Sequence, residues 1–101
     1  MILEYVRIRI SDGMEAAFEE GVEKAAPLFR RAKGCRSMSL KRVEEERGAY
    51  VLMVGWDTIE DHMVHFRGSE DFQEWRKLVG HCFAEPPKVE HLHVVARYFG
   101  D

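Results

Sequence analysis

The chain has 101 residues, of which 46% are hydrophobic and 33% are charged, and its formal net charge is −3. This length favours a single domain over residues 1–101, and the hydrophobic content is too high for a disordered chain. The charge balance provides no overall positive field for nucleic acid, and no apolar run is long enough to cross a membrane.

The chain opens with a strand pattern followed by a helix pattern. Residues 2–10 alternate in polarity, which predicts a strand, and one face of that strand is apolar: Ile2, Val6, Ile8 and Ile10. Apolar residues then recur at helical spacing over residues 14–32, with Ser11 as the expected N-cap. Pro27 interrupts this helix and Gly34 ends it.

The central part of the chain predicts a hairpin and the start of a second helix. Residues 35–43 alternate weakly, and the acidic stretch at residues 44–48 separates them from a strongly apolar strand at residues 50–56. Asp57, followed three residues later by Glu60, has the pattern of a capping box that begins the second helix.

The last part of the chain continues this helix and ends in a strand. Gly68 interrupts the helix, and Ser69 is expected to cap a continuation that runs to Phe83. After two prolines, residues 89–99 predict the final strand. The order of elements is β-α-β-β-α-β, which is the ferredoxin-like α+β motif.

This inventory predicts an assembly of two chains. Two helices cover only one face of a four-stranded sheet. Residues 51–54, and the final strand at Leu92 and residues 94–96, are nevertheless apolar on both sides, as in strands that are buried on both faces. We therefore expect a homodimer in which two sheets pack face to face as a dimeric α/β barrel.

Two features bear on the compartment in which the protein works. Cys35 and Cys82 lie far apart and neither belongs to a CxxC pair, which favours reduced thiols. Glu4 and Arg7 interrupt the first apolar stretch, so the beginning of the chain does not have the pattern of a signal peptide. We expect a cytoplasmic protein.

Several short segments together carry a family resemblance. They are Ala25-Ala26-Pro27-Leu28, Gly34-Cys35, the strand at residues 50–56, Glu60-Asp61-His62, Phe66-Arg67-Gly68-Ser69, Phe72, Trp75-Arg76 and residues 83–91. In this order and spacing, over essentially the whole length, the chain resembles the antibiotic biosynthesis monooxygenase (ABM) domains of the dimeric α+β barrel superfamily. The resemblance implies a ferredoxin-like fold and a homodimer. For some members it also implies oxygenation of quinol-like aromatics without metal or flavin.

Such an oxygenase needs a general base, because deprotonating a phenol makes the ring electron-rich enough to pass an electron to oxygen. His62 and His65 lie three residues apart on the second predicted helix, with Phe66 one turn beyond His62. Histidine titrates near neutral pH, so these two residues are the candidates for the base.

The same reaction needs an apolar, aromatic pocket that excludes water. The residues expected to bind a small aromatic substrate are Trp56, Phe66, Arg67, Trp75, His91 and His93. Arg67 is suited to pair with a phenolate, and His91 and His93 project from the same face of the last strand. We expect neither a cofactor nor a metal ion, because the spacing of the histidine pairs matches no established site.

Other interpretations of these residues remain open. The aromatic residues at helical spacing suit a structural core, Arg67 suits a surface ion pair, and one of two histidines three residues apart is often solvated. The alternative function is a non-catalytic or stress-related dimeric barrel that binds a small ligand. A haem- or metal-binding barrel is a further alternative, but related haem-degrading barrels use an asparagine and this chain contains none.

Overall fold

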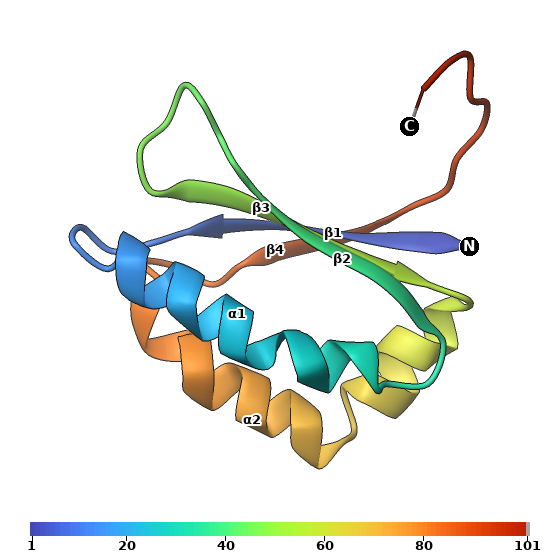
Figure 1. Ribbon diagram of the computed structural model, residues 1–101, viewed down its shortest axis with the longest axis horizontal. Helices are drawn as coiled ribbons and strands as arrows, with labels where there is room; N and C mark the ends of the chain where they lie inside the picture. The colour runs from blue at the N-terminus through green and yellow to red at the C-terminus, as the bar shows by residue number, and fades with distance from the viewer. Residues whose placement is uncertain (101) are drawn as a thin grey trace.

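The computed structural model describes residues 1–100 and shows an antiparallel sheet with both long helices on one face (Figure 1). The strand order is β2-β3-β1-β4, which confirms the ferredoxin-like α+β prediction. The elements in chain order are β1 (Ile2–Arg9), α1 (Glu15–Arg30), β2 (Cys35–Arg42), β3 (Ala49–Trp56), η1 (Asp61–Phe66), α2 (Glu70–Val79), η2 (Gly80–Cys82) and β4 (Lys88–Leu92).

The core lies between the sheet and the two helices. Alternate residues of β1 and β3 face the helices, so Val6 pairs with Leu52 and both are buried. Helix α1 contributes Phe18, Ala25 and Phe29, which are at most 2% exposed. In the part of the chain that the structure describes, no helix is long and apolar enough to cross a membrane.

The opposite face of the sheet is apolar at its centre. Leu3, Tyr5, Val51 and Met53 occupy the alternate positions of β1 and β3 and are half-buried. Both helices lie on the other side of the sheet, so neither covers these residues (Figure 1). The prediction that β3 is apolar on both faces is therefore confirmed for a single chain.

The predicted final strand is too long. The sequence pattern predicts a strand over residues 89–99, but β4 ends at Leu92, which pairs with Leu3. Strand β1 begins at Ile2, so only one of its residues lies beyond the Leu3–Leu92 pair before the neighbour of β4 ends. Residues 93–100 leave the sheet without forming a strand, and Val95 is 93% exposed. The tail leads away from the side of the sheet that the helices occupy (Figure 1).

Two of the predicted helix caps are also wrong. Ser11 does not cap α1 with its side chain; its carbonyl oxygen accepts a bond from Met14 N, and α1 begins at Glu15. Asp57 does not cap the next helix, because its carboxylate binds the Arg36 guanidinium at 2.8 and 2.5 Å. The Arg36 guanidinium on β2 and the backbone N–H groups at the start of the helix are alternative donors to the Asp57 carboxylate. The guanidinium binds it, so the carboxylate does not accept a bond from the helix backbone. Thr58 Oγ1 accepts the bond from Asp61 N at 3.1 Å instead.

The segment η1 is a π-helix rather than an α-helix. Its backbone makes a wide turn in which Arg67 N donates to His62 O at 3.0 Å, five residues back. A wider turn rotates position i+3 further away from position i than an α-helix does. His62 consequently faces the sheet and is 3% exposed, whereas His65 is exposed to solvent. The two candidate bases do not share a face.

Candidate functional site

A carboxylate lies in the core beneath the helices. Glu4 occupies a helix-facing position of β1, next to Val6, and is only 6% exposed. Burial raises the pKa of the Glu4 carboxyl from 4.5 to about 7, although a hydrogen bond from Trp56 and the positive charge of Arg67 both lower it. Glu4 therefore exchanges its proton near neutral pH, as a general acid or base must.

Two side chains hold the Glu4 carboxyl in place. The indole N–H of Trp56 donates to Glu4 Oε1 at 2.9 Å, and His62 Nε2 lies 3.3 Å from the same oxygen. The rings of Trp56 and His62 are stacked, with centroids 5.3 Å apart and an interplanar angle of 21°. Residues from β1, β3 and η1 thus meet at a single oxygen atom.

A second histidine extends this cluster. His62 Nδ1 lies 2.8 Å from His91 Nε2, so one of these nitrogens donates to the other. The sheet register fixes this neighbour, because Glu4 on β1 pairs directly with His91 on β4. Burial, followed by the charges of His91 and Arg67, lowers the pKa of His62 from 6.5 to about 4. His62 is therefore neutral near pH 7, and its Nε2 makes a close polar contact with Glu4 Oε1 rather than an ion pair.

The cluster borders a cavity of about 620 Å³ between α2, the segment that leads into β4 and the sheet. Glu4 and His62 line one part of its wall, and Arg67 and Arg76 add positive charge. Most of the remaining wall is apolar or aromatic: Val6, Ile8, Leu52, Phe72, Trp75, Phe83, Pro86, Pro87 and Val89. The volume suits a small aromatic molecule. Two wider hollows, of about 1010 and 730 Å³, lie along α1 and β2, and neither is lined by a histidine.

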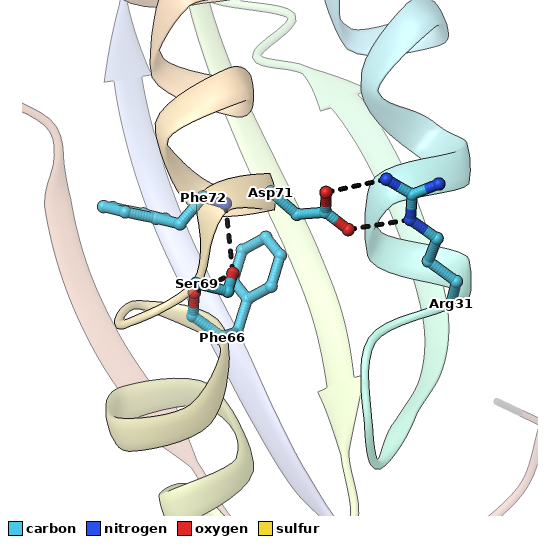
Figure 2. A network of polar contacts seen from close by, with 5 residues as sticks. All are labelled: Arg31, Phe66, Ser69, Asp71 and Phe72. Atoms are coloured by element: carbon cyan, nitrogen blue, oxygen red, sulfur yellow. Dashed lines mark hydrogen bonds and ion pairs between the residues drawn. The ribbon is translucent and has the colours of Figure 1, made fainter.

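The wall formed by α2 is anchored at its first turn (Figure 2). Ser69 Oγ accepts a hydrogen bond from Phe72 N at 3.2 Å and donates to Phe66 O at 2.6 Å, as a helix N-cap that joins η1 to α2. Arg31, after α1, binds both carboxylate oxygens of Asp71 at 2.7 Å. The predicted Ser69 cap is confirmed, and it orients the α2 residues that face the cavity.

The structure brings some of the predicted site residues together. His62, Arg67 and Trp75 line the cavity, while Trp56 and His91 contact its polar cluster. The Arg67 guanidinium lies 5.5 Å from the ring centroid of Phe72, in a cation–π contact rather than the surface ion pair considered above.

Other predicted site residues lie elsewhere. His65 and His93 are exposed and outside the cavity lining. Phe66 is 3% exposed and packs against the rings of Phe29, Trp56 and Phe72, which is a core position. Within residues 1–100, no three side chains of the His, Cys, Asp or Glu types are grouped like the ligands of a metal ion.

Sequence reasoning missed Glu4, although the alternation of the first strand contains the signal. Val6, Ile8 and Ile10 occupy the even positions of the inward face, so Glu4 must point into the core as well. A charged residue at a core-facing position is rarely fully buried without a partner, and it therefore indicates a polar site.

Comparison with known proteins identifies one family. The family model for antibiotic biosynthesis monooxygenases matches residues 1–78. The uncharacterized protein YczJ of Bacillus subtilis is 39% identical over 95 residues, which cover 94% of this chain and 100% of that protein.

Solved structures show the same likeness. A provisionally named antibiotic biosynthesis monooxygenase from Bordetella bronchiseptica is 54% identical, with a TM-score of 0.93 and coverage of 94% of this chain and 97% of that chain. SnoaB, a cofactor-independent oxygenase from Streptomyces nogalater, has a TM-score of 0.82 over 96% of this chain and 95% of its own. At 14% identity, SnoaB supports the fold alone.

Proposed function

Since the chain belongs to the antibiotic biosynthesis monooxygenase family, we propose that it is a cofactor-independent monooxygenase of a small phenol or quinol. The observation that supports this proposal is the buried Glu4–His62 pair, which opens onto an apolar, aromatic-lined cavity. This pair supplies a base, and the cavity supplies the dry surroundings in which a phenolate is a strong electron donor.

The proposed reaction begins when the substrate hydroxyl group gives its proton to the pair. The phenolate passes one electron to O₂, and the two radicals combine into a C–O bond at a ring carbon that carries hydrogen. Protonation of the peroxide, followed by loss of that ring hydrogen and of OH⁻ from the O–O bond, leaves a quinone and water. One oxygen atom of O₂ enters the product and the other leaves as water. The substrate supplies all four electrons that reduce O₂, so no separate reductant is required.

The other cavity residues favour the phenolate over the phenol. Arg67 places a positive charge at the wall that Glu4 and His62 also line, so it stabilises negative charge on the substrate oxygen. Phe72 and Trp75 supply aromatic surface against which a ring can pack. The size of the cavity favours substrates with one or two fused rings.

We also propose that the protein is a homodimer formed through the outer face of the sheet. The central residues of this face, including Tyr5 and Met53, are apolar, and neither helix covers them. The tail beyond β4 exposes Val95, Tyr98 and Phe99 at 89–93% of their surface, which favours burial against a second copy. Burial raises the pKa of the Cys35 and Cys82 thiols, which keeps both thiols protonated and poorly reactive near neutral pH.

Oxygen uptake with a panel of benzo- and naphthohydroquinones tests the enzymatic proposal, after subtraction of autoxidation. Uptake should rise with pH towards a plateau above about 7, as Glu4 ionises. It should fall by roughly 10²-fold or more in Glu4→Gln and His62→Gln, and the exposed His81→Gln serves as the matched control. Tight binding of the same compounds without turnover would instead favour the non-catalytic ligand-binding alternative.

A further inference from the structure

Three side chains from three separate elements form one continuous line of close polar contacts. Glu4 Oε1 on β1 lies 3.3 Å from His62 Nε2 on η1, and His62 Nδ1 lies 2.8 Å from His91 Nε2 on β4. Both ring nitrogens of His62 are therefore engaged, one on each side. A neutral imidazole that accepts a proton at one nitrogen releases a different proton from the other.

The two ends of this line lie in different surroundings. Glu4 is 6% exposed and lines the cavity, whereas His91 is half-buried and lies outside the cavity lining. The contacts at the Glu4 carboxyl use Oε1, which leaves Oε2 without a hydrogen-bond partner in the described part of the chain. Oε2 is not sealed in the core either, because no fully buried polar side-chain atom among residues 1–100 lacks a partner. The free oxygen therefore suits a donor that enters the cavity.

We propose that Glu4, His62 and His91 form a proton relay that carries the proton of a cavity-bound phenolic hydroxyl group out to solvent. The phenolic substrate class rests on the function proposed above. The hydroxyl proton passes to Glu4 Oε2, and a half-turn of the carboxyl group presents the new O–H to His62 Nε2. As His62 Nε2 gains this proton, His62 Nδ1–H passes its own to His91 Nε2, and His91 releases the proton from Nδ1 to water.

The surroundings of the relay favour passage of the proton over its storage. Arg67 faces the cavity beside Glu4 and His62, and its positive charge disfavours an imidazolium at His62. Burial acts in the same direction, so the proton stays on His62 only transiently. The other charged residues of the cavity lining are Arg76 and Glu85, and neither contributes to the shifts at Glu4 or His62.

The relay can be tested with meta-nitrophenol, whose phenolate absorbs at longer wavelength than the phenol. The protein is mixed with this probe by stopped flow, without oxygen, in weak buffer slightly above the pKa of Glu4. Absorbance follows phenolate formation, and a pH-indicator dye follows protons that reach the solution. In the wild-type protein both signals should share one time course.

Variants of His91 separate a relay from a structural role. His91→Gln retains a side chain that hydrogen-bonds to His62 but cannot carry a proton, so phenolate should form as in the wild type. Its proton should reach the solution at least about tenfold more slowly. His91→Ala should show the same delay, and added imidazole should remove it. His81→Gln, an exposed histidine outside the line, should behave as the wild type.

Two results would overturn the relay. One is proton release in His91→Gln at the wild-type rate, and the other is meta-nitrophenol that binds the wild-type protein without losing its proton. Because this experiment excludes oxygen, a chain that fails to oxygenate hydroquinones can still show the relay. Conversely, a failed relay with intact oxygen uptake would leave the proposed monooxygenase activity in place.

Discussion

The buried carboxyl of Glu4 makes the stability of the protein depend on pH. In the folded state its pKa is about 7, whereas in the unfolded chain it is about 4.5. Between these values the folded protein holds a proton that the unfolded chain has lost. The free energy of unfolding therefore falls as the pH rises from 4.5 to 7, and the loss is complete above this window.

The size of this effect follows from the shift. At about 1.4 kcal/mol per pKa unit, the change from 4.5 to about 7 corresponds to about 3 kcal/mol. Glu4→Gln keeps an oxygen that accepts the Trp56 N–H but has no charge to bury. Relative to the wild type, this variant should gain up to about 3 kcal/mol between pH 4.5 and pH 8, while it loses activity.

Urea unfolding at a fixed protein concentration measures this difference, because dimerisation would otherwise shift the apparent stability. With typical slopes, the midpoints of Glu4→Gln and wild type should separate by roughly 1 to 3 M between the two pH limits. The comparison must be made against the wild type at each pH. His62 has a lowered pKa, so its contribution is lost as the pH falls from 6.5 towards 4, which opposes the Glu4 slope.

Glu90→Gln is the matched control, since Glu90 is exposed on the neighbouring strand β4 and should show no such trend. A difference between Glu4→Gln and wild type that stays constant from pH 4.5 to 8 would refute the argument. So would a direct NMR titration of the Glu4 carboxyl that gives an ordinary value.

Three other changes test separate parts of the structure. Gly34→Ala should lower the free energy of unfolding by about 2 kcal/mol or more, because φ is +77° at this residue and a Cβ would overlap the Asp61 carboxyl. A urea midpoint equal to that of the wild type would contradict this packing. Ser69→Ala should cost about 1 kcal/mol through loss of the α2 cap, seen as a lower Tm, and Ser69→Asp should recover most of it. Met53→Asp should convert the proposed dimer to monomers, as measured by light scattering, because it places a charge on the outer face of the sheet. The control Gln73→Asp, on the exposed side of α2, should leave the dimer intact. A dimer that survives Met53→Asp would show that the interface lies elsewhere.

The order of strands and helices was predictable from the sequence because it depends on local periodicity. The alternation of β1, the apolar run of β3 and the Ser69 cap are each visible within a few residues. The end of the last strand was not predictable in this way. Residues after Leu92 have strand-like composition, but a strand also needs a neighbour, and β1 extends only one residue beyond the Leu3–Leu92 pair.

The candidate site was predictable only in part. His62 and Trp75 follow from helical spacing, but the π-turn that separates His62 from His65 has no comparable local signal. The pairing of Glu4 with His91 depends on a register between strands that are far apart in the chain. Local patterns identify which residues are suited to chemistry, whereas long-range pairing decides which of them meet.

Strand β4 is the shortest strand and lies at the edge of the sheet, bound on one side only by β1. Such a strand opens locally at a smaller free-energy cost than a central one. Because His91 is the next-to-last residue of β4, each opening of this strand end would detach His91 from His62 while the rest of the core remains folded. Amide exchange at the end of β4 would then report how often His91 separates from His62. A partner chain that packs against this edge would make such openings rarer and would lengthen the time for which the two histidines stay in contact.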